Sequence, residues 1–134
     1  MTAKGTFDTA NWTPQPPFDD RDGVTLGLVT LDKTFHGDLT GTSVVTMMIA
    51  TTPVEASRSY VALERVEGTL DGRSGSFVVQ HDATSDATSD AGEQSLRVRV
   101  VADSATGELR GLRGEMGIAI TPDGGHSYTF DYTL

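Results

Sequence analysis

The chain has 134 residues, 37% of them apolar and 22% charged, which is the size and composition of one globular domain spanning residues 1–134. Its formal net charge of −9 comes from 19 acidic and 10 basic side chains, and this acidic balance argues against nucleic-acid binding and a membrane-surface role. Cysteine is absent, which excludes disulfides, thiolate nucleophiles and zinc–thiolate sites.

Apolar and polar residues alternate with a period of two along most of the chain, which is the spacing of strands. The clearest case is SLRVRVV, where Leu96 and Val98 lie opposite Arg97 and Arg99. Apolar residues nowhere follow the helical spacing for three turns, so almost no helix is predicted. Eight strands are predicted, near residues 3–9, 24–36, 39–51, 58–69, 75–82, 94–102, 113–121 and 127–134.

Two connections have unusual composition. Residues 13–23, TPQPPFDDRDG, are rich in proline and aspartate and predict a long irregular link between the first two strands. Residues 82–92, DATSDATSDAG, repeat small polar residues and acids, which is typical of a solvated hairpin tip. We expect this tip to be the most mobile part of the molecule.

The pattern G-x-L-x-G occurs three times, at residues 37–41, 68–72 and 107–111. Its spacing places both glycines and the leucine on one strand face, so that strands can bend sharply or approach closely there. A short antiparallel sheet with two partly apolar faces must close on itself or stack on another sheet. Consecutive hairpins favour closure, so the predicted fold is all-β, a closed antiparallel up-and-down barrel of about eight strands.

Several longer segments occur in a fixed order: GTFDTANWTPQPPFD, KTFHGDLTGTS, YVALERVEGTLDGRSGSFVVQHDA, SATGELRGLRGE and YTFDYTL. Together they resemble the bacterial family of the domain of unknown function 3224 over nearly the whole chain. The resemblance implies an allene oxide cyclase-like β-barrel, a fold shared with dirigent proteins and several small cyclases. It implies no reaction, but such barrels often assemble, so it permits a homo-oligomer.

Glu64 is the strongest catalytic candidate. It shares a strand face with Tyr60, Ala62 and Val66, so if that face lines the barrel its carboxyl is buried among apolar groups. Its pKa should then rise, which is the usual way to obtain an acid or base near neutral pH. The alternative is that Leu63 and its neighbours point inward and Glu64 belongs to a salt-bridged outer surface.

His81 is the second catalytic candidate. It has the parity of Phe77 and Val79 at the end of a predicted strand, so it could shuttle protons at the barrel mouth. The alternative is a half-exposed histidine bonded to a turn carbonyl. The other two histidines, His36 and His126, have weaker claims, and the absence of H-x-H or H-x-x-x-H spacing argues against a metal site.

Aromatic residues supply enough surface to line a small-ligand cavity, although they could equally fill the barrel. The ligand-binding candidates are Trp12, Tyr60, Phe77, Tyr128 and Phe130. Of the adjacent Met47 and Met48, which lie on opposite strand faces, at least one is expected in the core.

Two functions remain open on this reasoning. One is a barrel that binds an apolar small molecule and catalyses its isomerisation or cyclisation, with Glu64 and His81 as polar groups. The other is a non-catalytic binding or self-associating barrel. No phosphate loop, Rossmann fingerprint or nucleophile elbow occurs, so no cofactor is expected.

No apolar run approaches the roughly 20 residues needed to cross a bilayer. The first residues, MTAKGTFDTANW, have neither the cationic start nor the apolar segment of a signal peptide. We therefore expect a cytoplasmic protein that binds neither nucleic acid nor membrane.

Overall fold

The computed structural model describes residues 1–86 and 95–134. Within these ranges the chain forms nine strands and one short 3-10 helix, and all strand pairs are antiparallel. The elements are β1 (Thr2–Pro14), β2 (Asp19–Arg21), β3 (Val24–Gly37), β4 (Leu39–Thr51), β5 (Arg58–Leu70), β6 (Arg73–Ser85), β7 (Ser95–Val100), η2 (Gly107–Leu109), β8 (Arg113–Ile120) and β9 (His126–Thr133).

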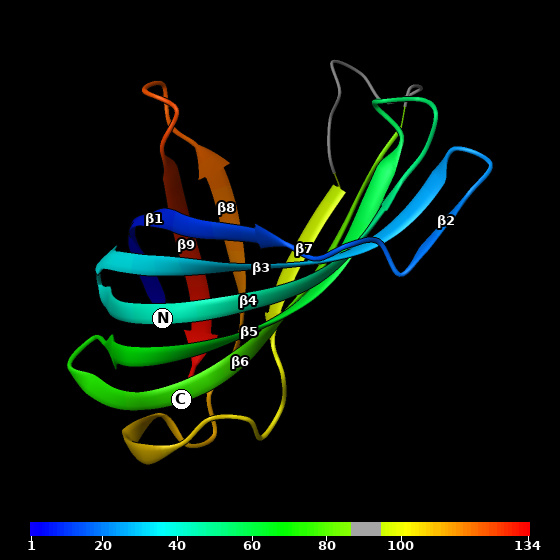
Figure 1. Ribbon diagram of the computed structural model, residues 1–134. Coiled ribbons are helices and arrows are strands. Elements are labelled where there is room, and N and C mark those ends of the chain that lie inside the picture. The colour runs from blue at the N-terminus through cyan, green and yellow to red at the C-terminus, as the bar shows by residue number, and fades with distance from the viewer. Residues whose placement is uncertain (87–94) are drawn as a thin grey trace.

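The strands close into a barrel (Figure 1). Each strand pairs with its neighbour in sequence from β3 to β9, and β1 pairs with both β9 and β3, which completes a ring of eight. The short β2 lies outside this ring, where it pairs only with β3. The predicted all-β fold, a closed antiparallel barrel of eight strands, is confirmed. Closure pairs the backbone groups that an open sheet would leave at its edges.

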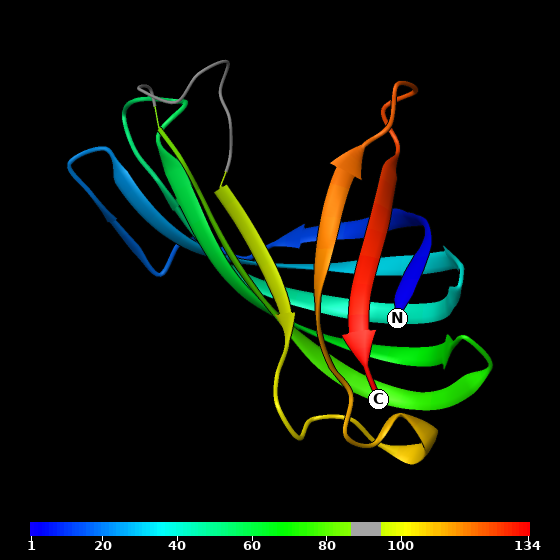
Figure 2. The same ribbon diagram turned by 180° about the vertical axis from the view of Figure 1, so that it is seen from behind.

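The wall of the barrel is weakest between β7 and β8. These strands pair only at Val98 with Met116 and at Arg99 with Glu115, whereas β4 and β5 pair along their whole length. Figure 2 shows β7 and β8 running apart from their lower to their upper ends. The ladder of hydrogen bonds is therefore short on this side of the ring.

The two ends of the barrel differ. We call "closed end" the end formed by the turns at residues 37–39 and 71–72, which the segment 101–112 covers from below in Figure 1. We call "open end" the opposite end, which carries the loops at residues 52–57 and 121–125. Large side chains fill the closed end, each of them at most 2% exposed. They are Phe35, Leu39, Val66, Leu70, Phe77, Val79, Leu109, Leu112, Tyr128 and Phe130.

All three leucines of the G-x-L-x-G repeats, Leu39, Leu70 and Leu109, belong to this filled core. The expectation that each repeat lies on one strand face is wrong. The first two repeats each cross a strand end into a turn, and the third forms η2. The leucines of the three repeats therefore lie at or next to turns at the same end of the barrel. Because the chain reverses direction there, their side chains can point inward.

The predicted close approach of strands is confirmed at Gly41 and Gly68, which lie opposite one another in β4 and β5. A Cβ atom on either residue would lie 2.1 Å from a carbonyl oxygen of the other strand. Such a contact is far inside van der Waals distance, so only glycine allows this separation of the two backbones.

Two tyrosine hydroxyls form hydrogen bonds that connect the elements of the closed end. Tyr128 Oη accepts a hydrogen bond from the Leu39 backbone N–H at 2.9 Å and donates toward the His36 carbonyl at 3.0 Å. Tyr132 donates its hydroxyl hydrogen to the Asp71 carboxylate, which, together with burial, raises the pKa of Tyr132 to about 12. These bonds connect β9 to the β3–β4 and β5–β6 turns.

Two predicted connections need revision. Residues 13–23 do not form one irregular link, because β1 continues to Pro14 and Asp19–Arg21 pairs with β3 as β2. Its prolines lie before β2 or at the end of β1, where no ladder hydrogen bond is lost. The strand β6 extends to Ser85, three residues beyond the predicted end, so the tip begins later than expected. Residues 87–92 of that predicted tip, and with them the expectation of high mobility, lie outside the described residues.

No helix in the described ranges is long and apolar enough to cross a membrane.

Candidate functional site

The side chain of Glu64 points into the barrel. It is 1% exposed, while Leu63 on the opposite face of β5 is 57% exposed. Tyr60, Ala62 and Val66 share its inward face, as the period of two predicts. The inward orientation of Glu64 is confirmed, and the alternative of a salt-bridged surface residue is wrong.

Glu64 belongs to a group of four buried polar residues that we call the polar cluster, one from each of the strands β3 to β6. Its members are Lys33, Ser43, Glu64 and His81, with exposed fractions of 7%, 4%, 1% and 3%. Lys33 lies opposite Ser43 in the ladder, and Glu64 lies one diagonal step from Ser43 and from His81. The cluster lies on the inner face of these four adjacent strands, between the filled core and the residues of the open end.

Both carboxylate oxygens of Glu64 are occupied within this cluster. Oε1 accepts a hydrogen bond from Lys33 Nζ at 3.1 Å and lies 2.7 Å from His81 Nε2. Oε2 accepts a hydrogen bond from Ser43 Oγ at 2.5 Å. The Lys33 ammonium also lies 4.5 Å from the centre of the Phe7 ring, within the range of a cation–π contact. The charges inside the barrel are thus paired and hydrogen-bonded, as burial requires.

The expected rise in the pKa of Glu64 is wrong, because its pKa is lowered. Burial is the largest single effect and raises the pKa, but the His81 hydrogen bond, the Lys33 charge and the Ser43 hydrogen bond together outweigh it. The sequence prediction considered only the apolar neighbours on the same strand, whereas the deciding partners come from other strands. Glu64 is therefore an ionised carboxylate at neutral pH, which does not suit it to act as a general acid.

His81 lies inside the barrel and not at the end of a strand. Because β6 continues to Ser85, His81 lies within the strand, opposite Val98 of β7, and its side chain is on the inner face of the barrel. Its hydrogen-bond partner is the Glu64 carboxylate, so the alternative of a half-exposed histidine bonded to a turn carbonyl is also wrong.

A cavity of about 530 Å³ occupies the open end of the barrel. Its walls are mainly apolar and include Phe7, Leu31, Val45, Met47, Leu96 and Ile118. Lys33 and His81 also line it, whereas Glu64 is not among its lining residues and lies behind them. The volume is within the range typical of small-molecule sites.

The predicted ligand-binding residues fall into two groups. Trp12 and Tyr60 line the cavity. Phe77, Tyr128 and Phe130 are at most 2% exposed and pack in the core of the closed end, away from the cavity lining. The phenol of Tyr60 is half-buried, and burial together with the Glu64 charge raises its pKa.

Trp12 reaches the cavity because of a bulge in β1. The register with β3 shifts between Ala10 and Thr13, so that two residues of β1 lie against one residue of β3. Asn11 has φ 57° and bonds to Asp32, and the next residue, Trp12, borders the cavity while 60% exposed. Without the bulge the even number of Trp12 would place it outside, with Lys4 and Thr6.

Sequence reasoning missed Lys33 and Ser43, although their signal was present. Lys33 has the parity of Leu31 and Phe35, both apolar, and Ser43 has the parity of Val45. A charged residue at an apolar parity position marks a buried charge that needs a partner. Glu64 was the same signal on β5, and combining the two would have predicted an ion pair.

In the parts of the chain that the structure describes, no three His, Asp or Glu side chains gather to hold a metal ion.

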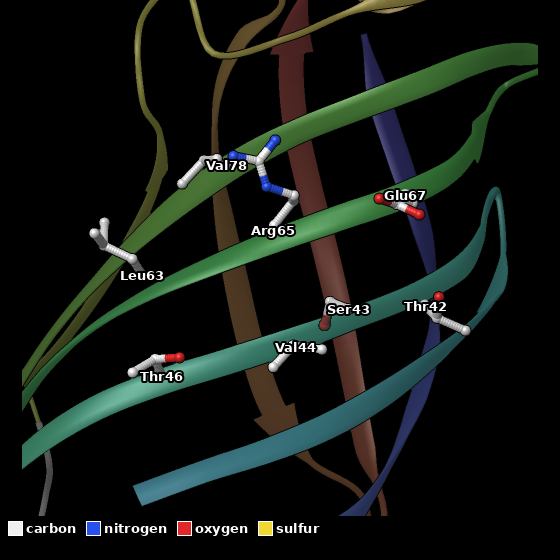
Figure 3. A pocket seen from close by; sticks show the side chains of 8 residues that line it. All are labelled: Thr42, Ser43, Val44, Thr46, Leu63, Arg65, Glu67 and Val78. Atoms are coloured by element: carbon white, nitrogen blue, oxygen red, sulfur yellow. The ribbon is translucent and has the colours of Figure 1, made fainter. Parts of the chain in front are cut away.

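Another hollow, of about 580 Å³, lies on the outer side of β4, β5 and β6. Figure 3 shows the side chains around it, among them Val44 and Thr46 from β4 and Leu63, Arg65 and Glu67 from β5. It is open to solvent, and Ser43 is the member of the polar cluster among its lining residues.

Comparison with known proteins agrees with the sequence resemblance. The chain aligns at 41% identity with a crystal structure of a protein with unknown function from the DUF3224 family of Shewanella oneidensis MR-1, with a TM-score of 0.90. The alignment covers 100% of this chain and 96% of that protein. No curated protein matches the chain. The profile of the family described as "Protein of unknown function (DUF3224)" matches residues 3–132, so the chain belongs to this family.

Proposed function

We propose that the protein binds an apolar small molecule in the cavity at the open end of the barrel. The observation that carries this proposal is the division of the interior, in which one end is filled and the other encloses about 530 Å³ with mainly apolar walls. An eight-stranded barrel is about the size that can hold one small ligand. Burying apolar ligand surface against such walls contributes roughly 25 cal/mol per Å².

Trp12 offers a direct test, because it is the one tryptophan of the sequence and lines the cavity. N-phenyl-1-naphthylamine is a neutral apolar fluorophore that brightens when it leaves water. We expect it to bind the protein and to quench Trp12 fluorescence by energy transfer. Native mass spectrometry of the purified protein would detect a molecule that the cavity already carries.

The adjacent methionines of β4 supply matched variants. Met47→Trp directs an indole into the cavity, whereas Met48→Trp places the same side chain on the outer face, where Met48 is 50% exposed. We expect Met47→Trp to weaken probe binding at least about tenfold and Met48→Trp to leave it unchanged. An equal effect of both variants, or no binding by the wild type, would contradict the proposal.

Self-association is a second candidate, supported by the outer face of β4 and β5. Val44, Met48, Val61 and Leu63 are 54%, 50%, 49% and 57% exposed there, which is unusual for neighbouring apolar residues on a monomer. The occupant we propose is a second copy of this chain.

Charge complementarity favours that occupant. Arg65 and Glu67 lie side by side on the outer face of β5, next to the apolar residues (Figure 3). In a two-fold dimer with antiparallel β5 strands, Arg65 of one copy would face Glu67 of the other, and the reverse.

Size-exclusion chromatography with light scattering tests this dimer. We expect Leu63→Asp to convert it to a monomer, while Val54→Asp, at an exposed loop position, changes nothing. A monomeric wild type at about 100 μM would contradict it, because a stable interface of this kind has a Kd of about 1 μM or below.

A further inference from the structure

Lys33 and His81 are polar residues of the cavity lining, and we call this part of the lining the floor. Lys33 is a hydrogen-bond donor whose N–H groups are only partly used by the protein. Lys33 Nζ carries three N–H groups, and in the described ranges Glu64 Oε1 is its one hydrogen-bond acceptor. Lys33 lines the cavity, so its remaining N–H groups are available to an oxygen atom of a ligand.

His81 presents an acceptor beside it. Since Glu64 is ionised, we assign the imidazole hydrogen to Nε2, which donates it to Oε1, and Nδ1 then carries a free electron pair. No described residue bonds to Nδ1, yet no enclosed side-chain nitrogen or oxygen of the described residues lacks a partner. Nδ1 is therefore not enclosed, and the space that His81 borders is the cavity.

The charge of the floor selects a neutral ligand. The ammonium of Lys33 is already balanced by the carboxylate of Glu64, whose oxygens are both occupied. A second anion or a cation from a ligand would be buried without a counter-charge, which is costly. A neutral oxygen acceptor for Lys33, next to a weakly acidic hydrogen for His81, satisfies both groups.

We propose that the floor binds the carbonyl of a neutral, mainly apolar ketone or aldehyde, and that His81 removes a proton from the adjacent carbon. This inference rests on the proposed binding function and names its ligand class. The C–H electron pair becomes a C=C bond, and the C=O π pair moves to the oxygen, which the Lys33 ammonium stabilises as an enolate. When the ligand carries a C=C bond in the β,γ position, the enolate is conjugated with it, and His81 returns the proton from Nδ1 to the γ-carbon. The C=C bond then lies in the α,β position, which gives an isomer without any oxidant or cofactor.

The residues of the cluster then have different roles. His81 and Lys33 are catalytic because they touch the reacting atoms, and Glu64 is a positioning residue that fixes the imidazole tautomer and balances the imidazolium. Tyr60 on the cavity wall keeps its proton, since its pKa is raised, and supplies a further neutral donor. The role first predicted for Glu64 thus passes to His81.

The test uses 2-tetralone, an apolar bicyclic ketone with acidic hydrogens beside the carbonyl, dissolved with the protein in heavy water. Proton NMR follows the exchange of these hydrogens for deuterium. We expect the wild type to accelerate exchange above the buffer rate and His81→Asn to lose about 100-fold or more of that acceleration. His36→Asn, at an exposed histidine that contacts Asp8 on the outer face, is the matched control and should exchange like the wild type.

Two further measurements separate chemistry from folding. Glu64→Gln should shift the midpoint of the pH–rate profile, whereas a purely structural defect would lower the rate equally at every pH. Because Lys33→Met leaves the Glu64 carboxylate buried without a cation, the Lys33 contact is measured in the wild type instead. The ¹³C resonance of the bound carbonyl should lie downfield of its position in hydrocarbon solvent, as expected for a carbonyl that accepts a charged hydrogen bond.

The outcomes distinguish the two proposals. If 2-tetralone displaces N-phenyl-1-naphthylamine but exchanges at the buffer rate at every pH, the base role of His81 is wrong and the binding function stands. Exchange that is equally fast in His81→Asn also overturns it. If neither compound binds the wild type, the binding function itself fails.

Discussion

The closed and open ends of the barrel are built from the same strands with the same alternation, yet their interiors differ. At the closed end, leucines and aromatic rings fill the interior and tyrosine hydroxyls tie β9 to two turns. At the open end, the inward side chains leave a cavity between them, and β7 and β8 separate. Figure 1 shows the contrast in the segment 101–112, which covers the closed end alone. The filled core and the cavity thus occupy different ends of one barrel, and the polar cluster forms the boundary between them.

The difference between the two ends predicts that a leucine-to-alanine substitution lowers the free energy of unfolding more at the closed end than at the open end. Leu70 is 1% exposed in the filled core, so Leu70→Ala should lower the free energy of unfolding by about 3 to 5 kcal/mol. Leu31 borders the cavity and already lacks neighbours on one side, so Leu31→Ala should cost about 2 kcal/mol. Urea unfolding measures both, and equal losses would show that the open end is as well packed as the closed end.

Removing one charged partner from the polar cluster should strongly lower the free energy of unfolding. Glu64→Leu leaves the Lys33 ammonium buried without an anion and should lower the free energy of unfolding by roughly 3 kcal/mol. Adding Lys33→Met removes the unpaired charge and should restore most of that loss. If the double variant is no more stable than Glu64→Leu in urea, the unpaired Lys33 charge is not the cause of the lost stability.

Because the pKa of Glu64 is lowered, the free energy of unfolding should depend on pH in acid. A carboxyl whose pKa is lower in the folded chain stabilises it above its ordinary pKa of 4.5, and this stabilisation is lost as the pH falls through the folded value. The free energy of unfolding should therefore fall more steeply below pH 4.5 in the wild type than in Glu64→Gln. Parallel pH profiles from urea titrations would contradict the lowered pKa.

Tyr132 at the closed end should make the free energy of unfolding depend on pH in alkali, and this change should be smaller than the one caused by Glu64 in acid. Tyr132 has a pKa raised from 10.0 to about 12, so its contribution is complete below pH 10.0 and is lost as the pH rises through about 12. Tyr132→Phe should reduce the decline in stability over this window. Tyrosinate absorbance near 295 nm checks the same point, because all three tyrosines have a raised pKa and Tyr132 should titrate at about pH 12, a step that Tyr132→Phe removes.

Much of the fold was predictable from local pattern. The period of two located the eight barrel strands and put Glu64 on one face with Tyr60, Ala62 and Val66, because side-chain direction in a strand follows parity, but it left open whether that face points inward. Trp12 was predicted as a ligand-binding residue from its aromatic side chain, and the bulge that brings it to the cavity lining is a change of register that parity alone does not reveal. Sequence reasoning gave the wrong sign for the pKa of Glu64, because hydrogen bonds to His81 and Ser43 depend on the register of neighbouring strands.

The sequence by itself determined that this chain is an all-β barrel without thiol chemistry, because alternation and composition are local properties of the chain. It also determined which side chains share a face on each regular strand. Only the tertiary structure decided that Lys33, Ser43, Glu64 and His81 meet, because the diagonal register of four strands sets those contacts. It alone decided which end is filled and which is hollow, since that depends on where turns and the segment 101–112 deliver side chains after closure.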